Sequence, residues 1–196
     1  MRKNFGAKEM CYPMPVFIIG TYNEDGTPNA MAAAWGGISN DKLISICIDK
    51  GHKTAANVVK RGAFTVSMAD EANIVACDYL GIVSGNDVPD KFSKSGFHAT
   101  PSDLVDAPLI DELCMCLECE MISYEDETLL GRIVDIKADE SVLTDGRIDV
   151  EKLKPVVYDP IAHTYRSIGA TLAGLFIGVG VPLVAYDKVG GVSVLN

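Results

Sequence analysis

A hairpin signal near the N-terminus constrains the fold of this chain more than any other feature. Residues 15–22 (PVFIIGTY) are apolar and rich in residues that favour strands, and a second such segment covers residues 28–35. The turn sequence Asn23-Glu24-Asp25-Gly26 stands between them. Two strand-forming segments joined by a short Gly-containing turn predict an antiparallel hairpin.

The rest of the chain continues this pattern of short strands. Further strands are predicted at residues 42–48, 63–68, 113–123 and 130–138, the last two being joined by an acidic turn at 125–127. Helices are predicted at 54–60, ending at Gly62, and at 70–81, followed by a long excursion over 82–108. At least six strands with two or three short helices predict a mainly β protein with helical insertions, an antiparallel, Greek-key-like barrel. No linker divides the chain, so residues 1–196 are taken as a single domain.

Composition excludes several classes of protein. The 196 residues are 48 % hydrophobic, enough to fill a core, and carry a net charge of -10 with no basic run. Nucleic acid and anionic membranes are therefore not expected partners. The start of the chain lacks the apolar core of a secretory signal, so we predict a cytoplasmic protein whose six cysteines are thiols. No G-x-G-x-x-G sequence follows a strand, so a Rossmann dinucleotide site has no support.

Residues 168–185 form a stretch of eighteen residues without a charge. This length raises the question of a membrane span. No basic cluster flanks the stretch, and a full globular domain precedes it. We therefore expect no membrane span, and we predict that this stretch is buried in the core or in a dimer interface.

The stretch from residue 29 to residue 57 concentrates the features that point to a ligand. Ala32, Ala33 and Ala34 leave the backbone bare beside Trp35, the only tryptophan, and bare backbone admits a flat ligand. After the next strand, residues 51–54 (GHKT) bring a cation and a hydroxyl to a helix N-terminus, which suits an anion. One ligand with a flat ring and a phosphate could span both features. The alternative is that the small residues pack a tight barrel and the 53–54 pair is merely solvent-facing or capping.

Cys114, Cys116 and Cys119 form a C-x-C-x-x-C sequence that could bind a soft metal. In a strand, however, the first two side chains share one face and the third lies on the other. No fourth ligand lies nearby in sequence, so we predict buried thiols and no metal site.

Short segments along the chain, from about residue 10 to residue 169, resemble the flavin-reductase-like family, and most closely its flavoredoxin branch. The matching segments are 25–29 (DGTPN), 31–35 (MAAAW), 52–54 (HKT) with Asn57, 64–67 (FTVS), 84–92 (SGNDVPDKF), 107–110 (APLI), 117–119 (LEC), 131–134 (GRIV) and 158–165. The chain departs from the family pattern at Cys114, where proline is common, and in its long apolar tail after Ser167. The resemblance implies a split β-barrel that holds FMN, usually at a homodimer interface.

The resemblance also assigns residues to the cofactor. It implies that Ala33, Ala34 and Trp35 line the isoalloxazine ring and that Lys53 and Thr54 hold the phosphate. The remaining candidates are the backbone of Cys47 and Ile48, the neighbours Asn40, Asp49 and His52, and Lys91 and Phe92 beside the ring. Because the matched segment 158–165 includes His163, the resemblance gives it a better claim to a site role than His98.

An FMN-binding oxidoreductase that passes electrons through its flavin is the function that the resemblance implies. The electron donor is either NAD(P)H, as in a flavin reductase, or a redox protein of the ferredoxin type, as in a flavoredoxin. No catalytic acid or base is assigned. The alternative is a non-redox ligand-binding module on the same split-barrel fold.

Overall fold

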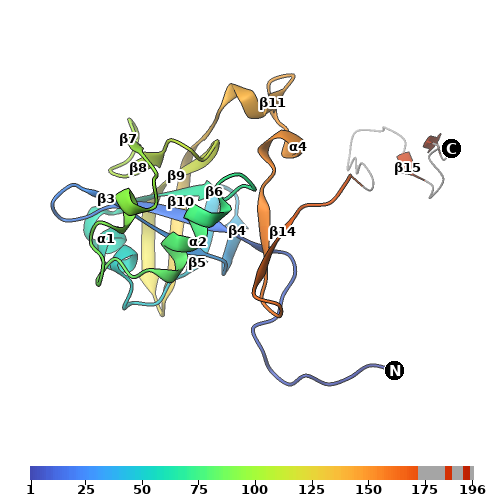
Figure 1. The fold of residues 1–196 in the computed structure, drawn as a ribbon, viewed down its shortest axis with the longest axis horizontal. Coiled ribbons are helices and arrows are strands. Elements are labelled where there is room, and N and C mark those ends of the chain that lie inside the picture. Colours follow the sequence, from blue (N-terminus) through green and yellow to red (C-terminus); the bar gives the residue numbers. More distant parts are fainter. Residues whose placement is uncertain (172–183, 187–191, 195–196) are drawn as a thin grey trace.

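The computed structural model describes residues 1–171, 184–186 and 192–194. Its centre is one antiparallel sheet of seven strands in the order β3-β2-β6-β9-β10-β5-β4. The strands are β2 (Phe17–Tyr22), β3 (Pro28–Ala33), β4 (Gly36–Asn40), β5 (Leu43–Cys47), β6 (Ala63–Met68), β9 (Met115–Glu125) and β10 (Thr128–Ala138). The sheet curls into a half-barrel (Figure 1), which confirms the predicted mainly β, split-barrel fold.

The predicted hairpin is confirmed, but its second strand is shorter than expected. β2 and β3 pair in register from Phe17 opposite Ala33 to Tyr22 opposite Pro28. The chain then leaves the sheet at residues 34–35 and re-enters it as β4, a strand that the sequence did not predict. β3 and β4 therefore occupy opposite edges of the sheet. A Cβ atom at Gly36 would lie 2.7 Å from the carbonyl oxygen of Ser45, so close packing of β4 on β5 requires glycine there.

The two predicted helices are confirmed with small shifts. The helices are α1 (Lys53–Arg61), α2 (Ile74–Ile82), α3 (Lys91–Lys94) and α4 (Val150–Leu153). α1 ends at Gly62, whose φ of 69° is left-handed and whose N–H donates to the carbonyl of Val58 at 2.8 Å. α2 begins later than predicted because the Asp70 carboxylate accepts a hydrogen bond from the Asn73 N–H at 2.9 Å, which holds the intervening residues in a turn.

Shorter elements complete the described part of the chain. They are β1 (Met14–Pro15), β7 (Ala99–Pro101), β8 (Pro108–Ile110), the 3-10 helix η1 (Glu140–Val142), β11 (Leu143–Thr144), β12 (Arg147–Ile148), β13 (Val156–Asp159), β14 (Thr164–Ser167), β15 (Val184–Tyr186) and β16 (Val192–Val194). β13 pairs with both β1 and β14. Most of the uncharged stretch 168–185 lies outside the described residues. Among those that are described, no helix combines the length and the apolar character that crossing a membrane requires.

Two hydrophobic clusters hold the helices on the sheet. Consecutive residues of β2 point to different clusters, Ile18 to one and Ile19 to the other, as the two-residue period of a strand requires. The cluster of Ile19 includes Phe64 together with Ala55 and Val58 of α1. The cluster of Ile18 includes Cys77 and Leu80 of α2, Phe92 of α3 and Val156 of β13. Helices α1, α2 and α3 are thus positioned by the apolar residues that they bury in these clusters.

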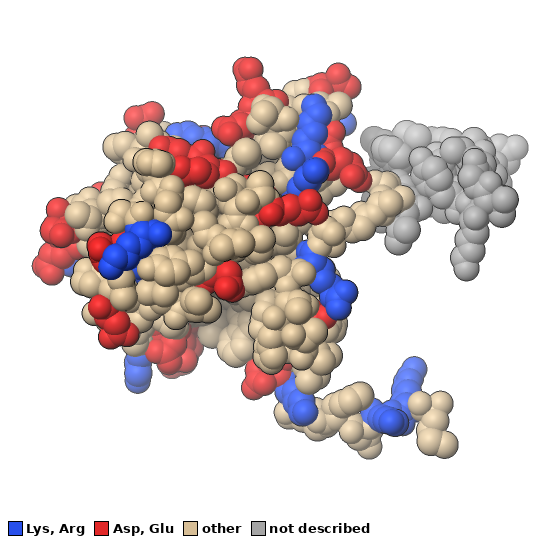
Figure 2. Space-filling view, viewed as in Figure 1, with Lys and Arg blue, Asp and Glu red and all other residues tan. Residues whose placement is uncertain are grey.

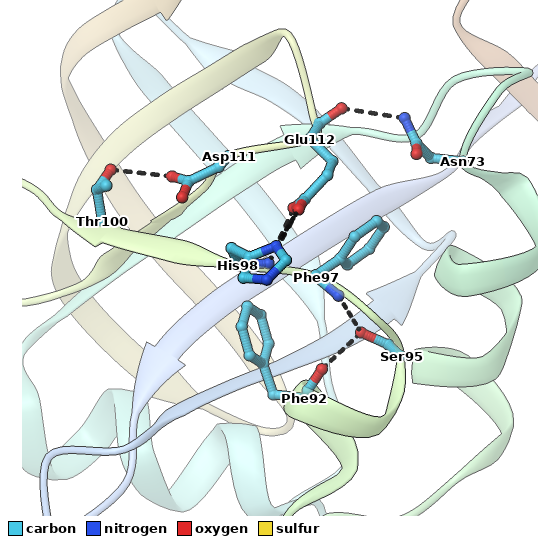
Figure 3. A network of polar contacts seen from close by, with 8 residues as sticks. All are labelled: Asn73, Phe92, Ser95, Phe97, His98, Thr100, Asp111 and Glu112. Atoms are coloured by element: carbon cyan, nitrogen blue, oxygen red, sulfur yellow. Dashed lines mark hydrogen bonds and ion pairs between the residues drawn. The ribbon is translucent and has the colours of Figure 1, made fainter.

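The excursion over residues 82–108 is tied to the segment that follows β8 (Figure 3). The backbone N–H of His98 donates to both carboxylate oxygens of Glu112, at 3.2 and 3.0 Å, and its ring Nδ1 lies 2.7 Å from Oε1. The hydrogen bond to Glu112 raises the pKa of His98. Ser95 Oγ donates to the carbonyl of Phe92 at 2.7 Å and accepts from the N–H of Phe97, which positions both buried rings.

Charge is distributed without a basic patch on the visible surface. On the described part of the face in Figure 2, Lys and Arg side chains are interspersed with more numerous Asp and Glu side chains. This pattern matches the net charge of -10 for the whole chain. A bound anion on such a protein requires a local site that overcomes the surrounding negative potential.

Candidate functional site

The first candidate cavity lies where β3 ends. Its volume is 430 Å³, and it is lined by Val16, Ala32, Ala33, Ala34, Asp78, Gly81, Ile82, Tyr158, His163 and Tyr165. The three alanines supply a floor of small side chains, while β13, β14 and the turn between them supply an aromatic wall. The structure therefore brings the predicted ring-lining residues Ala33 and Ala34 together with His163.

The wall of this cavity carries an ordered set of polar groups. Tyr165 donates its hydroxyl hydrogen to the Asp78 carboxylate at 2.6 Å, and the Tyr158 hydroxyl lies 2.9 Å from Nδ1 of His163. Burial, followed by the hydrogen bond to Asp78, raises the pKa of Tyr165. The Tyr158 and Tyr165 ring centroids are 5.8 Å apart. A small-residue floor facing hydrogen-bonding aromatic side chains suits a flat ligand with polar edges.

Trp35 lines a second cavity, also of 430 Å³, together with Cys47 and several residues of the N-terminal segment, among them Cys11 and Pro13. The Trp35 side chain is 51 % exposed. Its carbonyl accepts a hydrogen bond from the N–H of Cys47 at 2.8 Å, and the N–H of Ile48 donates to the carbonyl of Glu127 at 2.8 Å. The Ile48 carbonyl accepts from the Tyr124 hydroxyl at 2.6 Å. These N–H groups of Cys47 and Ile48 are committed inside the protein, so the structure does not offer them to a ligand.

The N-terminus of α1 borders a third cavity, of 510 Å³. His52 precedes the helix in an extended conformation, and no side chain caps the first turn. Lys53 is the first helical residue and lines the cavity with Asn23, Glu24, Asp25, Thr27, Gly85, Asn86 and Pro89. Glu24 is paired with Lys60, whereas Lys53 has no ion-pair partner among the described residues. An uncapped helix N-terminus beside a lysine favours an anion.

Thr54 belongs to a buried polar network instead of facing this cavity. Its side chain is 2 % exposed, and its hydroxyl oxygen accepts a hydrogen bond from the Asn29 amide at 2.9 Å. Asn29 also donates to Thr21, to which Asn57 donates at 3.1 Å. This network fastens α1 to β2 and β3. That Thr54 helps to hold a phosphate stays a prediction: its hydroxyl oxygen accepts from Asn29, and its backbone N–H lies in the first turn of α1.

The first cavity and the N-terminus of α1 lie along the same edge of the sheet, the edge formed by β3. Asn29, which contacts Thr54, and Ala33, which lines the first cavity, are four residues apart on β3, or about 13 Å in a strand. α2 and the loop after it follow this edge. A Cβ atom at Gly81 would lie 3.1 Å from Cβ of Ala32, and one at Gly85 would lie 2.8 Å from Oδ1 of Asn29.

Two residues predicted to lie beside the ring are buried structural residues. Lys91 is 3 % exposed and donates to the carbonyls of Leu80 and Val83, at 3.0 and 2.8 Å, at the C-terminal end of α2. Burial lowers the pKa of Lys91 to about 8. Phe92 is 4 % exposed and belongs to the hydrophobic cluster that includes Ile18 and Leu80. It also lines a small cavity together with Pro28.

Three further candidates lie outside the cavities described so far. Asn40 ends β4 and accepts a hydrogen bond from the N–H of Asp41 at 2.8 Å. It pairs with Leu43, at the end of β5 remote from Cys47, so the structure does not bring it to the site. Asp49 accepts hydrogen bonds from the N–H groups of Gly51, at 2.6 Å, and His52, at 3.1 Å. Asp49 and His52 thus shape the turn that leads into α1.

Sequence reasoning did not single out Asp78. The only sequence signal is a lone carboxylate in an otherwise uncharged helix, IVACDYLGI. Such a residue faces water more often than a site. Its role depends on Tyr165, which lies 87 residues later in the chain. A contact between such distant residues is visible only once the fold is known.

The cysteine-rich segment has the predicted alternation. Cys114 and Cys116 line a cavity of 530 Å³ on one side of β9, while Cys119 is fully buried in the hydrophobic cluster that includes Ile19 and Phe64. Burial raises the pKa of Cys119 to about 12. No cluster of three or more metal-binding side chains occurs among the described residues, which include all six cysteines.

Comparison with known proteins places this geometry in context. Residues 10–167 match the model of the flavin reductase like domain family. The flavoredoxin of Desulfovibrio vulgaris (Miyazaki F) has 39 % sequence identity and a TM-score of 0.86, covering 90 % of this chain and 98 % of that one. A flavoredoxin from Methanosarcina acetivorans has 26 % identity and a TM-score of 0.78, over 92 % and 96 % of the two chains. An FMN-binding domain of a flavin reductases-like enzyme from Shewanella baltica OS155 shares the fold at 19 % identity and a TM-score of 0.74, over 82 % and 88 %.

Proposed function

The chain belongs to the flavin reductase like family, and from this premise we propose that it binds FMN and transfers electrons through it, as a flavoredoxin-type protein. One observation carries the proposal. The small-residue cavity at the end of β3 and the uncapped N-terminus of α1 with Lys53 lie along the same sheet edge. The ribityl chain of FMN joins a flat ring to a phosphate and can bridge such a separation.

The first cavity fits the ring. Its 430 Å³ volume lies within the range of about 300–1,000 Å³ that is typical of small-molecule sites. Ala33 and Ala34 allow a flat face to approach the backbone, and Tyr158 and His163 offer polar atoms to a ring edge. The Tyr158 hydroxyl and His163 Nδ1 are within hydrogen-bond distance of each other, at 2.9 Å, and the imidazole tautomer sets which of them donates.

The end of α1 fits the phosphate. Lys53 supplies the cation, and the first N–H groups of α1 supply donors that no side chain caps. The acidic side chains of Glu24 and Asp25 at the same cavity are already engaged, by Lys60 and by Thr27 respectively. When bound, FMN supplies the redox chemistry, and the protein supplies orientation, exclusion of water and a local electrostatic environment.

Flavin binding is tested by colour and fluorescence. The purified chain is expected to be yellow, or to become yellow and bind stoichiometrically when FMN is added. Binding is expected to quench tryptophan emission, because Trp35 is the only tryptophan and directly follows Ala34. A colourless protein whose emission does not respond to FMN would contradict the proposal and leave a non-redox module on this fold.

The electron donor is proposed to be a redox protein. The 39 % identity to a flavoredoxin supports this choice over direct reduction by NAD(P)H. Steady-state oxidation of NADH or NADPH by the FMN-loaded protein separates the two. Turnover that saturates with either nucleotide would instead assign a flavin reductase.

A homodimer is proposed because core-facing side chains are left exposed. Ile38 pairs with the buried Ile44 and Ile136 with the buried Leu117, yet Ile38 is 68 % and Ile136 48 % exposed. Apolar side chains in this position are typical of an interface. Light scattering is expected to show a dimer that Ile38→Asp converts to a monomer.

The matched control for the dimer is Val75→Asp on α2, where the wild-type side chain is 82 % exposed but lies away from the sheet. This variant is expected to stay dimeric. A wild-type monomer, or a dimer that tolerates Ile38→Asp, would overturn the assignment of this surface.

A further inference from the structure

Two exposed cysteines share the cavity beside Trp35. Cys11 and Cys47 both line it, together with Pro13 of the N-terminal arm (residues 1–13) and Ser45 of β5. They are the two cysteines of the six that are exposed. Cys77, Cys116 and Cys119 are buried, and the half-buried Cys114 lines the separate cavity beside β9. Thiol reactivity requires access to solvent, so the two cysteines most accessible to reagents, Cys11 and Cys47, line the same cavity.

One of the two thiols lies in the central sheet, and the other lies in an exposed segment outside any strand or helix. Cys47 is the last residue of β5, and its N–H donates to the Trp35 carbonyl at 2.8 Å. Cys11 lies in residues 1–13, all of which are exposed and outside any strand or helix. Tyr12 attaches this arm through a 2.6 Å hydrogen bond to Asp159. Disulfide closure requires the arm to bring the two Cα atoms to a separation of about 4.4–6.8 Å.

We propose that Cys11 and Cys47 form a dithiol–disulfide site that reacts with small disulfides of the glutathione type. The thiolate of one cysteine attacks a sulfur of the small disulfide, which forms a mixed disulfide and releases one small thiolate. The second protein thiolate then attacks the protein sulfur of that mixed disulfide and releases the second small thiolate, which takes up a proton. Two protein thiols are oxidised to one disulfide, and one small disulfide is reduced to two thiols.

The ring closure has a structural consequence at Trp35. A Cys11–Cys47 bond would strap the N-terminal arm across the cavity that contains this side chain. The emission of the only tryptophan then reports the redox state of the pair. This chemistry needs no flavin, so its test and the test of FMN binding can fail independently.

The experiment treats the fully reduced, full-length protein with oxidised glutathione, stops exchange with acid and maps the disulfides by mass spectrometry. Because a tethered thiol acts at an effective concentration of roughly millimolar, closure is expected with glutathione disulfide below about 1 mM. The wild type is expected to lose two hydrogen atoms, to join the peptides of Cys11 and Cys47, and to change its tryptophan emission.

Single-serine variants separate this site from general oxidation. Cys114→Ser is expected to behave like the wild type, because that residue lines a different cavity. Cys11→Ser and Cys47→Ser are each expected to retain one glutathione on the remaining cysteine, with no closure and no emission change. The proposal is overturned if the wild type carries glutathione on both cysteines separately, pairs either with Cys114, or does not react.

Discussion

Replacing Lys53 by alanine is expected to weaken FMN binding by about ten- to a hundredfold. Lys53 is the first residue of α1 and has no ion-pair partner among the described residues, so its ammonium group is available to the proposed phosphate. A charge-assisted hydrogen bond contributes about 1.5–3 kcal/mol, which corresponds to this loss. Fluorescence titration of the wild type and of the variant measures it.

Riboflavin provides the control for this variant. It has the same ring without the phosphate, so it is expected to bind the wild type weakly and Lys53→Ala equally weakly. Raised salt is expected to weaken FMN binding and to leave riboflavin nearly unaffected, because salt screens the phosphate–lysine attraction. Lys152→Ala on α4, where the wild-type lysine contacts the carbonyl of Leu143, removes the same charge elsewhere and is expected to leave both affinities unchanged.

Two results would contradict the assignment of Lys53. Normal FMN binding by Lys53→Ala would place the phosphate elsewhere on the protein. Equal losses of FMN and riboflavin would mean that the substitution damages the fold instead of the phosphate contact. Damage to the fold is not expected, because the backbone N–H groups of α1 and the buried Asn29–Thr54 hydrogen bond do not depend on the lysine side chain.

Local sequence signals predicted most strands because each signal depends on neighbouring residues. The turn after Tyr22, the alternation in β5 and the glycine at the end of α1 all act within a few residues, and each matches the structure. β4 escaped prediction because its identity depends on pairing with β5. Gly36 directly follows Trp35 in the stretch interpreted as a ligand site, whereas the structure requires glycine there because a Cβ atom would meet the carbonyl oxygen of Ser45.

The predicted site residues line cavities where local chemistry decides their position, and they lie elsewhere where a distant partner decides it. Ala33, Ala34 and Lys53 each line a cavity. Lys91 was expected beside a ring, but the free carbonyls at the end of α2 attract its ammonium group instead. Nothing in the sequence around Lys91 indicates that its ammonium group will contact the end of a helix eleven residues earlier in the chain.

Phe64→Ala is expected to destabilise the protein by about 3–5 kcal/mol, the usual cost of emptying a buried phenylalanine site. Phe64 is fully buried and lies in the same cluster as Ala55 and Val58 of α1. Its ring also fills the space where Gly131 of β10 has no side chain. A Cβ atom at Gly131 would lie 2.3 Å from Cζ of Phe64, so Gly131→Ala alone is expected to cost about 1–3 kcal/mol through overpacking.

The two substitutions together are expected to cost less than the sum of their separate effects. The methyl group at residue 131 would occupy part of the volume that the Phe64 ring leaves, so we expect a compensating interaction of about 0.5–3 kcal/mol. Urea unfolding of all four proteins measures it. Gly37→Ala is the control, because no atom surrounds its Cβ position within 4 Å, and it is expected to change stability by less than about 0.5 kcal/mol. Strictly additive losses would show that the Phe64 ring does not pack on Gly131.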